Sequence, residues 1–288
     1  MLQNNITKKP QTTFASYVKS DAVLANISKT LGSATRGKKF VASIISAVNT
    51  NKQLQECDFA TIVSAGIVGD SLNLSPSPQL GHYYMVPFRD TKNNRTVATF
   101  QLGYKGYLQL AIRSGQYKKI NVVAVKDGEL LSYNPFTEDI EVRAITDPLE
   151  REKAPTIGYY GMFELTNGFT KSMYWSKETM EEHAQKYSKG YAAHKGYTFW
   201  EKDFDGMAFK TMLRQLISKW GIMSIEMQQA VERDMAAINT DGTYDYVDNE
   251  TEPVDAIIQQ QEDNAQEEQT KTTISNSTET KEVSMNEL

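Results

Sequence analysis

The sequence predicts an α+β fold in which helices surround β-hairpins and a disordered acidic tail follows. Three observations favour this fold. Apolar residues recur at helical spacing, two pairs of aromatic and β-branched segments are joined by turn residues, and bulky apolar residues become scarce beyond residue 240. We therefore expect a flexible N-terminal arm over residues 1–24, a core over 25–235 and a tail over 236–288.

The first half of the core is predicted to contain three helices, a hairpin, a fourth helix and a strand. The hairpin strands are joined by a basic turn, and two prolines set a loop before them. In chain order, the helices are expected at residues 21–31, 38–48 and 59–68, the loop at 72–79, the hairpin strands at 82–88 and 96–102, the fourth helix at 103–114 and the strand at 120–125.

The second half of the core is predicted to contain another hairpin and two helices. Residues 157–165 and 169–175 are the expected strands, because the Asn167-Gly168 pair between them favours a tight hairpin turn. The elements that follow are a helix capped by Ser176 and the longest helix of the chain, over residues 200–220 and ended by Gly221.

The composition excludes several classes of protein. The chain has 288 residues, of which 40% are apolar and 23% charged, as in a soluble globular protein. The single cysteine, Cys57, allows neither an internal disulfide nor a thiolate zinc site, and it favours a reducing compartment. No apolar run reaches the roughly 18 residues that span a bilayer, and the N-terminus lacks the features of a secretory signal. These features predict a cytoplasmic protein.

The net charge of −5 averages two unlike segments. Residues 1–230 hold 28 Lys and Arg against 21 Asp and Glu, whereas residues 231–288 hold 3 against 15. A basic body with an acidic appendage is typical of proteins that bind polyanions. Ordinary surface charge is the alternative interpretation.

The segment around the fourth predicted helix is basic and aromatic. No acidic residue occurs between Asp90 and Asp127, so the cations of this segment create an uncompensated positive field. The tyrosines offer flat faces on which bases can stack, although core packing is the alternative for them. The candidate DNA-binding residues here are Lys105, Gln109, Arg113, Lys118 and Lys119, and the candidate stacking residues are Tyr104, Tyr107 and Tyr117.

The longest predicted helix repeats this design. Lys210 and Arg214 stand one turn apart beside an apolar stripe, and Lys219 lies on another face. Cations from the two helices together would line a groove that follows a phosphate backbone through charge. The alternative is that they are the solvated flanks of two amphipathic helices.

Motifs for catalysis are weak. Residues 32–39 approach a phosphate-binding loop, but Lys39 stands where a Mg²⁺-binding hydroxyl is needed. Gly103 and Gly106 match the short clamp of KH domains, a pattern with little specificity. The three histidines lack metal-ligand spacing and the carboxylates are scattered, so no metal site is predicted. We expect a binding protein without catalytic residues.

Two long segments carry a family resemblance. Residues 101–117, QLGYKGYLQLAIRSGQY, and residues 204–221, which begin FDGMAFKTMLR and end SKWG, resemble the RecT family of phage and prophage single-strand annealing recombinases. The resemblance covers roughly residues 25–230 and implies an annealing core like that of Rad52 proteins. The chain departs from it at Phe209, where relatives often hold a polar or basic residue.

The resemblance implies an ATP-independent, non-enzymatic protein that coats single-stranded DNA and anneals complementary strands. The implied annealing activity requires no cofactor, and assistance of annealing by Mg²⁺ is left open. Its implied partners are single-stranded DNA, the annealed duplex intermediate, further copies of itself in rings or helical filaments, a phage 5′→3′ exonuclease and a host single-strand-binding protein, with no membrane. The family's DNA contacts transfer onto Lys105, Arg113, Lys118, Lys119, Lys210 and Arg214.

Two other functions remain open at this point. One is a nucleotide-dependent strand-exchange protein that uses residues 32–39 as its phosphate loop. The other is a sequence-specific DNA-binding regulator. Nucleotide hydrolysis stimulated by DNA would indicate the first, and strong preference for one duplex would indicate the second.

Overall fold

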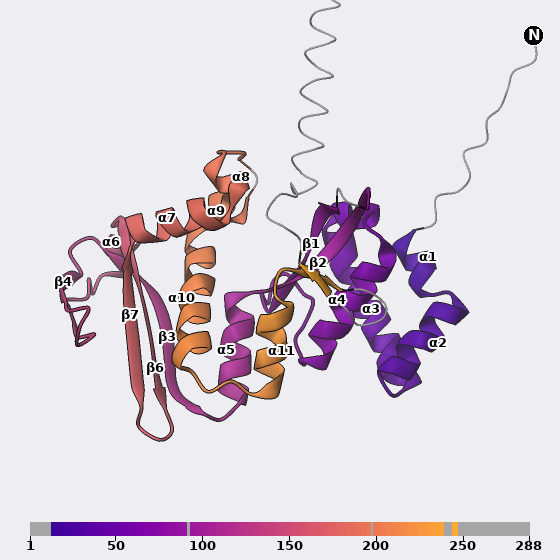
Figure 1. Ribbon diagram of the computed structural model, residues 1–288, viewed down its shortest axis with the longest axis horizontal. Helices are drawn as coiled ribbons and strands as arrows, with labels where there is room; N and C mark the ends of the chain where they lie inside the picture. Colours follow the sequence, from indigo (N-terminus) through magenta and orange to yellow (C-terminus); the bar gives the residue numbers. More distant parts are fainter. Residues whose placement is uncertain (1–12, 91–92, 197, 239–243, 247–288) are drawn as a thin grey trace, which may run out of the picture.

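The computed structural model describes residues 13–90, 93–196, 198–238 and 244–246. The molecule is elongated (Figure 1). Helices α1 to α4 occupy one end, a three-stranded sheet occupies the other, and α5, α10 and α11 stand side by side between them. The predicted α+β class is confirmed, since the strands pair in antiparallel sheets that helices cover. No described helix is long and apolar enough to cross a membrane.

The N-terminal end is helical, and all three helices predicted there are present. One element was missed, because a helix of five residues is too short to show a periodic pattern. Its residues Phe14 and Val18 are fully buried, so the folded part begins earlier than the predicted boundary at residue 25. The elements are α1 (Phe14–Val18), α2 (Asp21–Thr30), α3 (Ala34–Thr50), the 3₁₀ helix η1 (Lys52–Glu56) and α4 (Phe59–Ser71).

The first sheet is built on the predicted hairpin. Its strand order is β1-β2-β8-β9, with Thr99 of β2 opposite Ala237 of β8. The last two strands fall in the segment predicted as tail, because strands of three residues show no alternation. The rest of that predicted tail lies outside the described residues. The strands are β1 (Tyr83–Asp90), β2 (Arg95–Leu102), β8 (Ala236–Ile238) and β9 (Tyr244–Tyr246).

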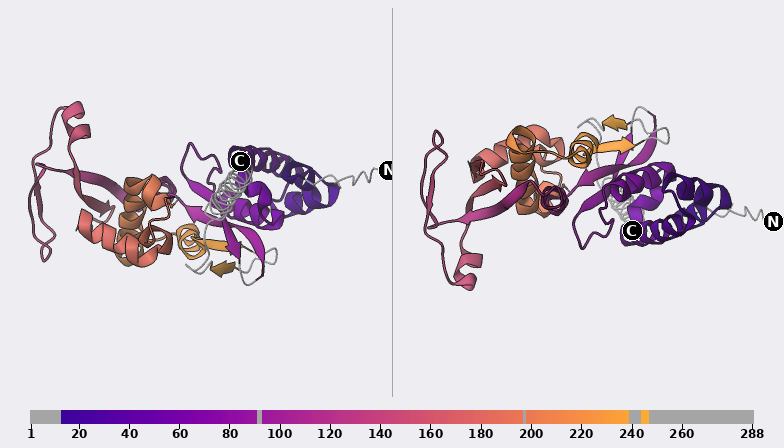
Figure 2. Two further views of the ribbon diagram at one scale, coloured as in Figure 1. Left: turned by 90° about the horizontal axis from the view of Figure 1, so that it is seen from above. Right: turned by 90° about the horizontal axis from the view of Figure 1, so that it is seen from below.

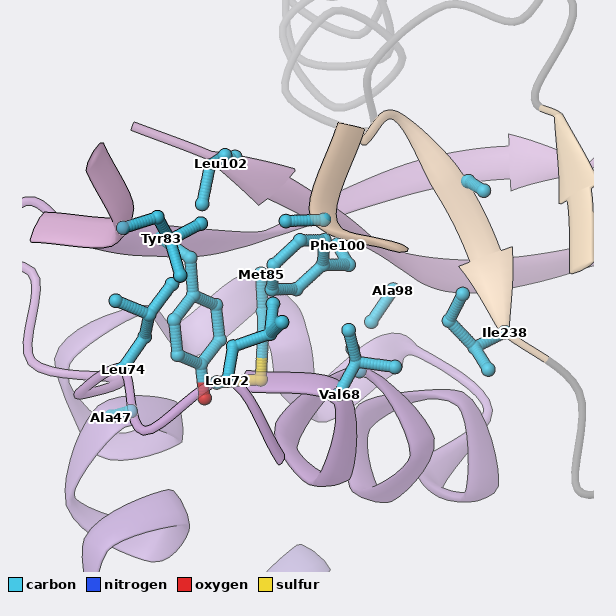
Figure 3. Packing of buried hydrophobic residues seen from close by; sticks show 14 of the residues in the cluster. Ala47, Val68, Leu72, Leu74, Tyr83, Met85, Ala98, Phe100, Leu102 and Ile238 are labelled. Carbon is cyan, nitrogen blue, oxygen red and sulfur yellow. The ribbon is translucent and has the colours of Figure 1, made fainter. Parts of the chain in front are cut away.

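The main core lies between this sheet and α4. Figure 3 shows Tyr83 and Phe100 of the hairpin above Val68 of the helix and Leu72, which directly follows it. The rings of Tyr83 and Phe100 lie 5.1 Å apart between centroids. Gly69 lets the Tyr83 ring approach the backbone of α4, because a β-carbon at this position would collide with that ring. The hairpin is thereby fixed on the helices that precede it.

The second sheet has the order β3-β6-β7 and contains the other predicted hairpin. Gly168 adopts φ +87° in its turn, a conformation that favours glycine, so the Asn-Gly prediction is confirmed. Ser176 caps α7 (Lys177–Tyr187) as predicted, with its hydroxyl accepting from the Thr179 backbone N–H at 3.2 Å. The strands are β3 (Tyr117–Lys126), β6 (Thr156–Leu165) and β7 (Thr170–Ser176).

The longest predicted helix is divided. Asp203 leaves helical geometry and its carboxylate accepts from the Gly206 backbone N–H at 3.0 Å, which starts a new helix. Gly221 ends that helix in extended backbone, and a side chain there would collide with the Tyr117 hydroxyl. The remaining helices are α5 (Tyr104–Arg113), α8 (Lys189–Ala192), α9 (Phe199–Lys202), α10 (Phe204–Trp220) and α11 (Ile225–Arg233).

One excursion between β3 and β6 was not predicted. It consists of β4 (Leu130–Tyr133), β5 (Ile140–Val142) and α6 (Pro148–Lys153). The two strands pair with each other in a small separate sheet. Its elements are too short for a periodic signal, which is why the sequence showed only a loop region.

Candidate nucleic-acid interface

The two helices predicted to carry the DNA-binding cations are neighbours. Tyr104 of α5 packs edge-on against Phe209 of α10, with ring centroids 5.6 Å apart. Phe209 also contacts the ring of Tyr159 on β6 at 6.0 Å. The departure from the family pattern at this position therefore contributes an apolar contact between helices and sheet.

A buried carboxylate lies where α5, α10 and β2 meet. Asp234, which follows α11, has a side chain with no exposed surface. Its Oδ1 accepts from Lys210 Nζ at 3.0 Å and from the Leu102 backbone N–H at 2.9 Å. Its Oδ2 accepts from Arg214 Nη1 at 3.3 Å and from the Tyr107 hydroxyl at 3.3 Å. We call Asp234, Lys210, Arg214 and Tyr107 the Asp234 cluster.

The cluster holds two cations against one carboxylate, so it retains a positive charge. The Lys210 side chain is only 10% exposed, whereas that of Arg214 is 40% exposed. Lys210 therefore neutralises Asp234 inside the protein, and Arg214 keeps part of its guanidinium in solvent. A buried ion that loses its partner is strongly destabilising, which makes Asp234 a structural counter-ion.

Lys210 is buried, whereas the sequence predicted it among the cations that line a groove. Helical spacing shows which residues share a face of a helix, but it does not show what covers that face. Here Asp234 covers it, and its position in the acid-rich segment after residue 230 concealed it from the sequence analysis. The available signal was an acidic residue between the amphipathic α11 and a short apolar run, Ala236–Ile238.

Two of the three candidate stacking residues belong to the core. Tyr107 is fully buried; burial above all, and then the charge of Asp234, raises its pKa well above the ordinary value. Tyr117 is 9% exposed and its hydroxyl donates to the Ile222 carbonyl at 3.0 Å, with burial raising its pKa to about 12. Neither ring has a face open to a base in this structure. Tyr104 is half-buried against Phe209.

The α5 candidates, in contrast, are exposed. Lys105 and Gln109 face solvent. The guanidinium of Arg113 donates to the carbonyl oxygens of Leu72 at 2.6 Å and Asn73 at 3.2 Å. Arg113 thereby satisfies the end of α4, where a cation is favoured by the helix dipole, and it still presents an exposed side chain.

The pKa of His82 reflects burial and the positive charges on α5. Burial lowers the pKa of His82, and the charges of Arg113 and Lys105 lower it further. Its Nδ1 accepts from the Ser75 backbone N–H at 3.3 Å, which fixes the ring beside α5. Two cations from one helix thus act on the same imidazole.

The candidates on β3 and at the end of α10 are also exposed. Lys118 pairs with Glu164 at 2.5 Å, and an exposed pair of this kind contributes about 1 kcal/mol or less. Lys119 has no ion-pair partner among the residues that the structure describes. Lys219 Nζ lies 5.6 Å from the centroid of the Trp220 ring. Lys105, Gln109, Arg113, Lys118, Lys119 and Lys219 are the exposed candidates, which lie on α5, at the start of β3 and at the end of α10; the name exposed cationic face refers to these six residues collectively.

The competing motifs are built into helices. Gly32, with φ +76°, joins α2 to α3, and α3 begins at Ala34, so most of residues 32–39 are helical. A phosphate loop follows a strand, and here a helix precedes it. Gly106 lies inside α5 against the His82 carbonyl. Among the described residues no group of His, Cys, Asp and Glu could hold a metal ion.

Exposed cations on α5 and at the start of β3, in a segment without acidic residues between Asp90 and Asp127, are typical of a protein that binds a polyanion such as DNA. Comparison with known proteins agrees. The profile of the RecT family matches residues 38–255. The uncharacterized protein YqaK of Bacillus subtilis (strain 168) is 40% identical over 238 residues, covering 80% of this chain and 78% of that protein. Protein RecT of Escherichia coli (strain K12) is 32% identical over 183 residues, covering 63% and 65% respectively.

The chain therefore belongs to the RecT family. Membership implies a single-strand annealing protein that acts in DNA recombination, a class that is generally not catalytic. The family match begins in α3 and ends beyond β9, so it contains all three sheets, the Asp234 cluster and the exposed cationic face.

Proposed function

We propose that this protein coats single-stranded DNA and anneals it to a complementary strand without ATP, in the cytoplasm of a bacterial host. The observation that carries the proposal is the exposed cationic face on α5 and the start of β3, in a segment without acidic residues between Asp90 and Asp127. Its cations neutralise phosphates and release counterions from the strand.

Annealing forms no covalent bond, so it needs no catalytic residue. Its obstacle is kinetic, because two polyanions repel and single strands fold on themselves. A cationic surface removes the charge of the first strand and holds its backbone extended, and base pairing then supplies about 1.4 kcal/mol per step. Phosphate contacts carry no sequence information, so we expect little preference between sequences.

The Asp234 cluster has a positioning role in this proposal. Asp234 accepts a hydrogen bond from Nη1 of the Arg214 guanidinium, and the Arg214 side chain is 40% exposed. An arginine fixed in this way loses less side-chain entropy when it meets a phosphate. Lys210 stabilises the fold, because its ammonium group is the second cation that binds the Asp234 carboxylate.

The proposed partners are those that the annealing activity requires. Copies of the protein assemble along the strand as rings or helical filaments, and a phage 5′→3′ exonuclease supplies that strand. A host single-strand-binding protein is the competitor it meets there. No cofactor is required, and Mg²⁺ assists by screening the phosphates of the second strand.

The decisive experiment is annealing of two complementary fluorescent oligonucleotides, with and without Mg²⁺ and with no nucleotide present. We expect the protein to accelerate duplex formation for any sequence, and the Lys105→Ala/Lys119→Ala variant to do so less. Absence of acceleration by the wild-type protein contradicts the proposal.

The same assay separates the two alternatives. Acceleration that appears only with a nucleoside triphosphate, and that Lys38→Ala abolishes, indicates nucleotide-dependent strand exchange. Strong preference for one duplex over scrambled competitors indicates a sequence-specific regulator.

A further inference from the structure

The excursion between β3 and β6 is an arm that projects at one end of the molecule. We call residues 127–153 the acidic arm, since they contain eight Asp and Glu and three Lys and Arg. It carries β4, β5 and α6 and stands apart from the helices, as Figure 2 shows from above and below. None of the functional residues discussed so far lies in it.

The acidic arm is fixed to the sheet. At its base Glu129 is buried and accepts from Arg151 Nε at 2.6 Å, while Arg151 Nη2 donates to the Ala124 carbonyl at 2.8 Å. Burial opposes ionisation of Glu129, but hydrogen bonds from Arg151 and from the Lys126 backbone outweigh it and lower the pKa. At its tip Glu138 pairs with Lys171 of β7. The arm is therefore an ordered element that is held at its base and at its tip.

This fixed arm exposes large apolar side chains. The exposed fraction is 95% for Phe136, 66% for Leu149, and 52% for both Leu131 and Val142. Several exposed large apolar side chains on one ordered element are typical of a protein interaction site. The arm holds eight Asp and Glu against three Lys and Arg, so a basic surface is complementary to it in charge.

A basic surface lies at the opposite end of the molecule. Residues 13–56, which form α1, α2, α3 and η1, contain six Lys and Arg and two Asp and Glu. We call this region the basic face. Its lysines are exposed and have no ion-pair partner within the described part of the chain: Lys19, Lys29, Lys38, Lys39 and Lys52.

The two surfaces cannot meet within one copy, because they lie at the two ends of the long axis (Figure 1). We infer that the acidic arm of one copy docks on the basic face of a second copy, in a head-to-tail contact. Such a contact joins different patches and repeats from copy to copy, so it produces rings or open filaments. The inference rests on the proposed function for one point, the assembly of copies along the strand, and it names the contact between those copies.

The first test removes the apolar anchor. Phe136→Asp is expected to weaken self-assembly about thirtyfold, the effect of losing a central aromatic residue of an interface. The matched control is Ile225→Asp on α11, which is 73% exposed and belongs to neither surface. Mass photometry and sedimentation, with and without long oligo(dT), measure assembly. Affinity for a short oligo(dT) that holds one copy is expected to be unchanged in both variants.

The second test uses the head-to-tail geometry. Lys38→Glu/Lys39→Glu disables the basic face, and Phe136→Asp disables the arm. Each variant alone is expected to stay small, but a mixture of the two can form one intact contact and is expected to stop at a dimer.

Three results would overturn the inference: wild-type assembly by Phe136→Asp, no dimer in the mixture, or loss of short-oligonucleotide binding by the lysine variant while its assembly is kept. The last outcome would assign the basic face to DNA. Failure of the proposed function is distinct, since the wild-type protein would then not accelerate annealing, whatever the assembly of the variants.

Discussion

Two sets of cations that look alike in the sequence have different environments in the structure. The set on α5 and β3, represented by Lys105 and Lys119, faces solvent. The set on α10 contains Lys210, which is buried on Asp234, and Arg214, which is partly exposed beside it. Lys105 on α5 and the two cations of α10 follow helical spacing beside an apolar stripe, and Lys119 lies on strand β3. The difference comes from a carboxylate that is distant in sequence and that covers only one of the two faces.

The comparison shows what a charged residue near an apolar stripe can do. Where nothing covers it, its charge is available to a ligand. Where a buried carboxylate covers it, the charged residue forms an ion pair that holds helices together. A ligand can then contact only the part of that side chain that stays exposed. Arg214 stands between these cases, since Asp234 binds one side of its guanidinium.

The largest expected effect comes from removing the shared counter-ion. Asp234→Ala leaves Lys210 buried without a partner, and we expect the free energy of unfolding to fall by about 3–5 kcal/mol. Urea denaturation measures it. The control is Glu164→Ala, which breaks the exposed pair with Lys118 and should cost about 1 kcal/mol or less. Equal costs for the two variants would show that the Asp234 cluster has no special role.

A smaller effect is expected from Lys210→Met. Asp234 keeps Arg214, the Tyr107 hydroxyl and the Leu102 backbone N–H, so one lost charged hydrogen bond should cost about 1–3 kcal/mol. Urea denaturation of Lys210→Met and of Asp234→Ala under the same conditions compares the two losses in the free energy of unfolding. A loss as large as that of Asp234→Ala would mean that Arg214 does not compensate.

The smallest effect is a pH dependence at the exposed cationic face. Burial, and then the charges of Arg113 and Lys105, hold the pKa of His82 below its ordinary value of 6.5 in the free protein. A bound phosphate offsets those charges and raises this pKa, so binding takes up a proton and should tighten as pH falls below about 6.5. The free protein should lose stability over the same interval, because the unfolded chain then binds more protons.

Fluorescence anisotropy with oligo(dT) between pH 5.5 and 7.5, repeated with His82→Gln, checks this dependence. We expect the variant to lose the part of the pH dependence that lies near pH 6.5. Identical profiles for the two proteins would remove His82 from the surface that DNA reaches.

The sequence predicted most of the fold because the signals were local. Asn167-Gly168 predicted a hairpin and Ser176 a helix start, and both are confirmed by contacts within a few residues. The break at Asp203 was missed because an aspartate inside an amphipathic pattern resembles a surface position. Elements of three to five residues, α1 and β8 among them, carry too few side chains to show a period.

The site was less predictable than the fold, because burial depends on residues far apart in the chain. Tyr107 and Lys210 meet on Asp234, which lies in the segment predicted on composition as the start of the acidic region. Composition averages over a segment and cannot identify the single acid that folds into the core. The family resemblance indicated α5 and α10 as the helices of the candidate site, and the structure shows which of their side chains are exposed.

The most direct test of the difference between the two sets of cations is the salt dependence of single-stranded DNA binding. The affinity for oligo(dT) is measured over a range of salt concentrations for the wild-type protein, Lys105→Ala/Lys119→Ala and Lys210→Met. Each lost phosphate contact should reduce the slope of log affinity against log salt by about 0.7. The account predicts a slope reduced by about 1.4 for the double variant and an unchanged slope for Lys210→Met. An unchanged slope in the double variant, or an equal reduction in Lys210→Met, would contradict it.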